Sequence, residues 1–269
     1  MPASRSASRD TKRAPPARAR RWPLILLGLI VLSAAVIFAL PASLAARFMP
    51  AQVHAEDFSG SLLHGAAGKI SINARNAGAV EWQVHPLSLL RLAIVADVHW
   101  VNVGFLIDGT AEISPGGFAA HDIQGGGPLG DLQTLGFAAG WKGTAKLTFT
   151  TIKGTFRKLE AAVGKIEVAN ISSLGVAAGS DLGSYELQLG PDSVAPDGTL
   201  SATLNDNGGP VEAQAQIRFS PATRTGMLSG TLKERPEASP ALRNQLSNLS
   251  QLHPRDASGR FPVELEFSF

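Results

Sequence analysis

Apolar and polar residues alternate with a period of two along most of the chain from about residue 60 to the C-terminus. In the last segment Val263 and Leu265 alternate with Glu264 and Glu266, which in a strand places all apolar side chains on one face. Parallel sheets are covered on both faces and have continuous apolar strands, so one-sided strands favour antiparallel pairing. We predict an all-β fold, a curved, mostly antiparallel sheet with one apolar face. The same alternation occurs at residues 80–84, 92–100, 147–149, 166–168, 185–189, 200–204 and 211–219.

Turn residues and two short helical segments interrupt this pattern. Residues 205–209 read Asn-Asp-Asn-Gly-Gly and predict a hairpin turn. Residues 86–90 predict one turn of helix, and residues 239–249 predict a longer helix with Ser239 as N-cap and Pro240 at its first position. Its apolar face lies at helical spacing, so we expect this helix to lie across the sheet before the final strand. That face consists of Leu242, Leu246 and Leu249.

The N-terminal part has the pattern of a membrane anchor. Residues 22–46 contain no charged side chain, and at about 1.5 Å per residue they exceed the ~30 Å core of a bilayer. Residues 1–21 carry seven cations against the single acid Asp10, a net of +6, whereas the whole chain carries +2, which leaves −4 for residues 22–269. A basic flank lies on the cytoplasmic side of a span.

We therefore predict a basic cytoplasmic tail (1–21), a single transmembrane helix (22–46), a juxtamembrane linker (47–59) and a periplasmic β-rich domain (60–269). The alternative is a signal peptide cleaved after the small-residue pattern at Ser43, Leu44 and Ala45. The cationic tail lacks interleaved aromatic residues and abuts the predicted span, so topology explains it better than nucleic-acid binding does.

Known catalytic and ligand-binding motifs are missing from the sequence. There is no Gly-x-Ser-x-Gly pentapeptide, no Cys, and no pair of His at the i, i+4 spacing of a helical zinc site. Residues 65–69 fail the spacing of a phosphate loop, and no Glu follows Asp206 at the twelfth position of a calcium loop. His85 and His99 fall on polar strand faces as solvated side chains. We predict no enzyme, no cofactor and no metal, although a site assembled from distant segments stays open.

One apolar sheet face is larger than two short helices obviously cover. One interpretation is an ordinary core that the sheet closes by curling on itself. The other is a groove that holds a lipid acyl chain or a segment of a partner protein, because uncovered apolar surface of that size marks binding. Unpaired sheet edges also allow strand addition by a partner.

Short motifs, in order along the chain, resemble those of a known family, protein N of the bacterial type II secretion system. The first half carries a Gly-rich hairpin segment and a Trp-x-x-x-Pro motif followed by a Leu pair. The second half carries a Gly-x-Tyr-x-Leu strand and a closing segment. These positions are Gly60, Gly65, Trp82, Pro86, Leu89, Leu90, Gly183, Tyr185, Leu187, Pro240, Leu242, Leu246, Gly259 and Arg260. Leu63 and Val168 stand where the family often has tryptophan.

The resemblance implies an accessory component of the type II protein secretion machinery, in the inner membrane of a Gram-negative bacterium. It would act by protein-protein interaction in the periplasm with other inner-membrane or periplasmic secretion components, and the family offers no catalytic residues. The alternative is an AsmA-like envelope protein that holds or carries lipid in an apolar β groove.

Overall fold

The computed structural model describes residues 39–49, 51–135, 140–173, 176–221, 223, 225–252 and 255–268. The chain divides into two units, Met1–Ala39 and Leu40–Phe269. The predicted tail (1–21) and most of the predicted span (22–46) lie outside the described residues. Among the described residues, no helix is both long and apolar enough to cross a membrane.

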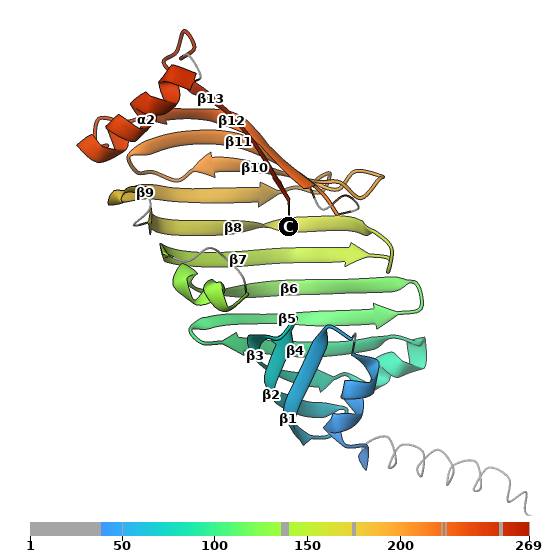
Figure 1. Ribbon diagram of the computed structural model, residues 1–269. Coiled ribbons are helices and arrows are strands. Elements are labelled where there is room, and N and C mark those ends of the chain that lie inside the picture. Colours follow the sequence, from blue (N-terminus) through green and yellow to red (C-terminus); the bar gives the residue numbers. More distant parts are fainter. Residues whose placement is uncertain are drawn as a thin grey trace, which may run out of the picture. The chain divides into compact units, whose positions relative to one another are not determined.

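Thirteen strands of the described chain form one sheet, and each pairs with its sequence neighbours in antiparallel orientation (Figure 1). This confirms the predicted all-β, antiparallel sheet. The first and last strands are not paired with each other, so this sheet has two edges. The strands are β1 (Val53–Gly60), β2 (His64–Ile72), β3 (Arg75–Val84), β4 (Ile94–Asn102), β5 (Phe105–Ser114), β6 (Gly117–Pro128), β7 (Trp141–Gly154), β8 (Leu159–Ser173), β9 (Val176–Leu189), β10 (Leu200–Asp206), β11 (Val211–Ser220), β12 (Thr225–Glu234) and β13 (Phe261–Ser268).

Among the described residues, four helical segments accompany the sheet: η1 (Ala42–Phe48), η2 (Pro86–Arg91), η3 (Leu129–Leu135) and α2 (Pro240–Leu252). The predicted helical turn at 86–90 and the helix at 239–249 correspond to η2 and α2. As predicted, Ser239 caps α2, because its Oγ accepts a hydrogen bond from the backbone N–H of Leu242 at 3.2 Å. The pattern did not predict η3, and η1 lies across the end of the predicted transmembrane helix and the start of the predicted linker; each is a single short 3₁₀ segment without amphipathic repeat.

The β unit begins earlier in the chain than predicted. Strand β1 and the end of η1 occupy most of residues 47–59, which the sequence predicts as a linker. Leu40 and Pro41, inside the predicted span, already bond to the sheet: the Leu40 carbonyl accepts from Leu62 N–H at 2.7 Å, and Pro41 pairs with Ser61. The alternation in β1 is broken by Asp57, whose φ is 57°, and this hides the strand.

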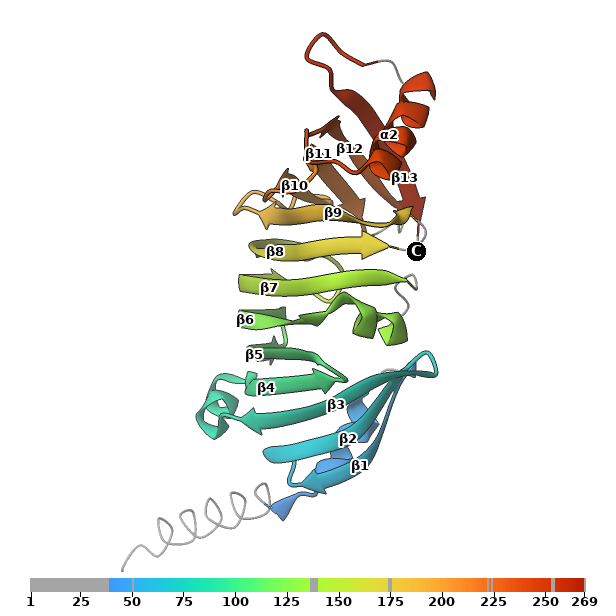
Figure 2. The same cartoon turned by 90° about the vertical axis from the view of Figure 1, so that its left-hand side faces the viewer.

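Helix α2 covers one end of the sheet's apolar face. Figure 2 shows the helix beside β13. Leu242 and Leu246 of α2 are buried against Val211 of β11 and Phe261 of β13. Burying a leucine side chain contributes about 1.5–3 kcal/mol, so these two residues hold the helix to the sheet. A second cluster at β8, β9 and β10 contains Ala162, Leu189 and Ala202.

A β-bulge at Asp122 keeps the apolar residues of β6 on one face. Asp122 has a left-handed backbone (φ 51°), and the pairing between β5 and β6 shifts by one residue here. His121 and Gln124, on either side of it, both pair with polar residues of β5, whereas Ile123 lies against Gly109. Without the extra residue, every apolar side chain beyond this point would change face.

Replacing Asp122 with Val is expected to lower the free energy of unfolding by roughly 1–2 kcal/mol, because a β-branched side chain clashes in the left-handed region. The matched control Asp122→Gly, which adopts that conformation freely, is expected to stay within about 0.5 kcal/mol of the wild type. Denaturant unfolding of the full chain in detergent measures both. Equal losses for the two variants would contradict the strained bulge.

Tyr185, the one tyrosine of the chain, lies on β9 next to the α2 end of the sheet. Its hydroxyl donates a hydrogen bond to the Leu182 carbonyl at 2.6 Å. Burial raises the pKa of Tyr185 to about 12, and the carboxylates of Asp206 and Asp181 add to the shift. Since only the folded state disfavours the tyrosinate, stability is lost as pH rises above the unfolded pKa of about 10.

Alkaline titration followed by tyrosinate absorbance therefore reports this one position. In the folded protein at about pH 11, most of Tyr185 should remain neutral, whereas the chain in guanidinium should titrate near pH 10. Coincident titrations in the two states would show that the ring is open to solvent.

Candidate functional site: the apolar inner face

A row of apolar residues runs across all thirteen described strands, through directly paired positions. Each member pairs with the next, so that one residue of every strand takes part, and none has a polar side chain. We call it the apolar row. Its members, from β1 to β13, are Phe58, Ala67, Val80, Trp100, Ile107, Gly125, Leu147, Ile166, Leu187, Leu204, Ala215, Gly230 and Val263.

The residue next to each member lies in a second row on the opposite face. We call it the polar row, because twelve of its thirteen members are polar or charged. They are Ser59, Ala66, Glu81, His99, Asp108, Gln124, Thr148, Lys165, Gln188, Thr203, Gln216, Ser229 and Glu264. The sheet thus has an apolar inner face and a polar outer face over its whole described width.

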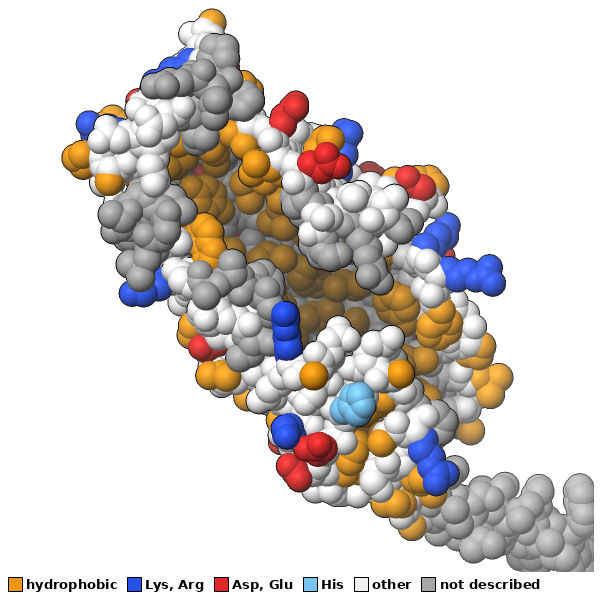
Figure 3. All heavy atoms as spheres, in the orientation of Figure 1, with side chains coloured by type: hydrophobic (Ala, Val, Ile, Leu, Met, Phe, Trp, Pro, Cys, Tyr) orange, Lys and Arg blue, Asp and Glu red, His pale blue; other side chains and the backbone are white. Residues whose placement is uncertain are grey.

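The inner face lines a hollow, and Figure 3 shows hydrophobic side chains along its floor. In the middle of the sheet Ile107, Leu147 and Ile166 are only half-buried, since α2 covers the far end. The strand backbones bond to one another and the row has no polar side chain, so this surface offers hydrophobic and dispersion contacts only. It suits an acyl chain or the apolar side of a protein segment, and it cannot hold a charged ligand.

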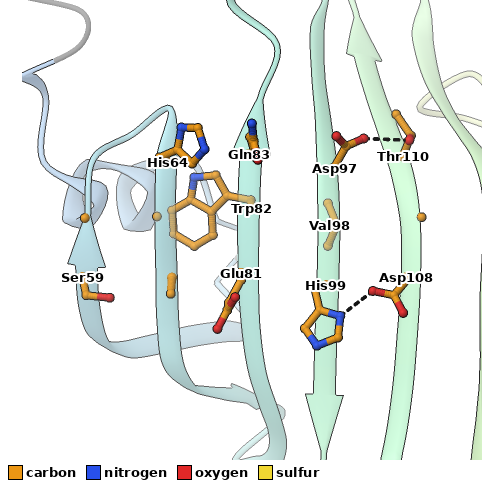
Figure 4. Close-up of a pocket in the computed structure, with 14 residues that line it drawn as sticks. Ser59, His64, Glu81, Trp82, Gln83, Asp97, Val98, His99, Asp108 and Thr110 are labelled. Carbon is orange, nitrogen blue, oxygen red and sulfur yellow. Dashed lines mark hydrogen bonds and ion pairs between the residues drawn. The ribbon is translucent and has the colours of Figure 1, made fainter.

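The outer face has a depression of about 550 Å³ over β1–β5, where Figure 4 shows His99 bonded to Asp108 and Asp97 bonded to Thr110. His99 Nδ1 bonds to Asp108, and this raises the pKa of His99. Asp97 accepts from His85 Nε2 at 2.8 Å and from the Thr110 hydroxyl at 2.9 Å, and these hydrogen bonds lower the pKa of Asp97.

The sequence predicted His85 and His99 as solvated side chains on a polar face, and both are about half exposed. Their carboxylate partners were missed, since cross-strand pairing depends on register and not on local spacing. Exposed pairs of this kind gain little from their charge. Among the residues that the structure describes, no group of three His, Asp or Glu side chains could hold a metal ion.

The first group of motif residues builds the β1–β2 hairpin. Gly60 has φ 80°, and the backbone of Gly65 lies under the indole of Trp82, where a Cβ would come within 2.6 Å of the ring. Trp82 Nε1 donates to the Leu62 carbonyl at 2.9 Å. Pro86 begins η2 next to this hairpin, with Leu89 half-buried and Leu90 exposed.

The second group lies at the other end of the sheet. On β9, Gly183 (φ 106°) approaches the backbone of Gly208, with Tyr185 and Leu187 beyond it. Pro240, Leu242 and Leu246 belong to α2. Gly259 (φ 75°) forms the turn before β13, where the Arg260 guanidinium pairs with Glu212 and donates to Gln214 Oε1 at 3.2 Å. The motif residues therefore form two separate structural groups and converge on no common centre.

A family model described as type II secretion system, protein N, matches residues 51–264. The match spans the sheet from β1 into β13 and contains both motif groups. Comparison with curated proteins gives no match, and neither does comparison with solved structures. The match over more than half of the sequence establishes that this chain belongs to the protein N family of the type II secretion system.

Proposed function

We propose that the protein is an accessory component of the type II secretion machinery that is held in the inner membrane and acts through protein-protein contacts in the periplasm. The family match carries this proposal, since membership implies contact with other secretion components. The charge-free stretch at 22–46 behind a +6 tail supports a single pass with the N-terminus in the cytoplasm. The described β unit would then lie in the periplasm.

The sheet offers two surfaces for such contacts. Its edge strand β13 has a free side, and Leu265 on that strand is 57% exposed. At the other edge, β1 packs against η1. Pro262, Glu264 and Glu266 on β13 disfavour uncontrolled pairing with other edges, which leaves room for a partner with a matching strand or apolar surface.

A pull-down of the tagged full chain from gently solubilised membranes tests the proposal. We expect it to recover other secretion components, and we expect deletion of the gene to reduce export. The tagged segment 1–46 alone is the matched control, because it keeps the predicted anchor and lacks the sheet. Recovery of no secretion component, together with unchanged export, would overturn the proposal.

The apolar row favours a second candidate, an AsmA-like function in which the hollow holds or carries lipid. An acyl chain needs no hydrogen bonds, and each CH₂ group that leaves water contributes about 0.8 kcal/mol. A peptide backbone laid along the same row would find no partners for its N–H and C=O groups.

Leu147→Lys is expected to remove tightly held phospholipid from the purified full chain, because it puts a charge into the row. Thr148→Lys is the matched control: Thr148 is the next residue on β7 and belongs to the polar row. Both variants keep the predicted anchor and the lipid around it. A difference in bound phospholipid between the two variants, measured by native mass spectrometry, therefore reports the lipid in the hollow. Equal phospholipid in the wild type and both variants would exclude this function.

A further inference from the structure

Exposed apolar side chains line one rim of the sheet. Leu87 and Leu90 of η2, with Leu92 behind them, are 77%, 83% and 77% exposed. The short teal helix beside β4 in Figure 1 carries the first two of these leucines. Such exposure of three neighbouring leucines is costly in water and marks a contact surface.

The same rim continues across β4–β7. Ile94 pairs with Ile113 and Ile113 pairs with Phe118, so the ends of three strands present apolar side chains side by side. These side chains are 49%, 52% and 37% exposed, and Phe156 in the β7–β8 loop is 68% exposed. The apolar rim consists of Leu87, Leu90, Leu92, Ile94, Ile113, Phe118 and Phe156.

Cations outnumber acids around the apolar rim. Arg91 stands in the last turn of η2, and Arg157 and Lys158 directly follow Phe156, with Lys153 nearby at the end of β7. The acids beside these four cations are Glu112, Glu160 and Asp197, which follows Pro196 in the β9–β10 loop, where the Pro196 carbonyl accepts a hydrogen bond from Lys158 Nζ at 3.2 Å. Exposed apolar side chains flanked by cations suit the surface of a bilayer that contains anionic lipid.

The chain joins the sheet at this rim. Leu40 and Pro41 bond to residues 61 and 62, in the turn between β1 and β2. That turn lies next to the end of β3, just before η2, because the Leu63 carbonyl accepts a hydrogen bond from Val84 N–H at 2.7 Å. Leu40 and Pro41, in the C-terminal part of the predicted span, therefore join the sheet beside the exposed leucines.

We propose that the apolar rim docks on the lipid surface of the membrane that anchors the chain, with the η2 leucines inserted at the boundary of headgroups and acyl chains. The proposal rests on the inner-membrane location proposed above. Ile113 and Phe118 continue the inner face outward, since Ala111 and Ala120 pair on that face one step deeper. Docking there opens the hollow toward the bilayer.

The absence of native cysteine allows a direct test with a single label. Full-length Leu90→Cys carries an environment-sensitive fluorophore in nanodiscs that contain phosphatidylglycerol and nitroxide-labelled lipid. Ala257→Cys is the matched control, because Ala257 is exposed in the turn before β13, at the opposite ends of the strands. We expect lipid nitroxides to quench the label at position 90 at least threefold more strongly than the label at 257.

Equal, weak quenching at both positions would overturn the proposal. Shielding of position 90 from a water-soluble quencher without quenching by lipid would also overturn it, in favour of a protein partner. Co-elution of the chain with the nanodiscs is measured separately. A chain that fails to co-elute refutes the membrane location itself, whereas a chain that co-elutes with position 90 in water refutes only the docking of the rim.

A second variant tests the rim as a unit. Leu87→Asp combined with Leu90→Asp changes two exposed side chains, so the fold should persist. A label at Phe156→Cys should then lose at least half of its quenching by lipid nitroxides. Unchanged quenching at 156 would show that η2 does not dock this part of the sheet.

Discussion

Register holds this structure together, because each strand must pair with its neighbour at the one offset that keeps the apolar row continuous. A slip of one residue at any strand pair would bring polar-row side chains such as Lys165 or Gln188 onto the inner face. Residues with left-handed backbones absorb the mismatches. Asp122 does so in β6 and Asn170 (φ 54°) in β8, where the pairing with β9 shifts by one. Asp and Asn tolerate this conformation better than other side chains, so the bulges cost little.

The fold leaves its core unusually open. Buried apolar clusters form where α2 covers the sheet and where β8, β9 and β10 meet, while the middle of the inner face is half-buried. Every strand pair joins sequence neighbours, so stability is mainly a sum of local hairpin contacts, as in repeat proteins. A sheet of this kind can keep a hollow without losing its fold, because no single central core has to be filled.

The sequence predicted most of the fold because period-two alternation is a local signal. It indicated the one-sided sheet, the Ser239 cap, and Leu242 and Leu246 on the buried face of α2. It failed where an element has no regular local pattern. The left-handed backbone of Asp57 interrupts the alternation in β1, and the short η1 and η3 have no amphipathic repeat. The His99–Asp108 pair and the apolar rim could not be found in this way, since both depend on which strand ends lie next to each other.

The strict meander sets a rule for how such a sheet can change in length. Adjacent strands run in opposite directions, so the chain returns to the same rim only after two strands. Insertion or loss of one whole hairpin would lengthen or shorten the hollow while every other turn stays at its own rim. Loss of a single strand would send all later turns, including the one before α2, to the opposite rim. The length of the hollow therefore varies in steps of two strands.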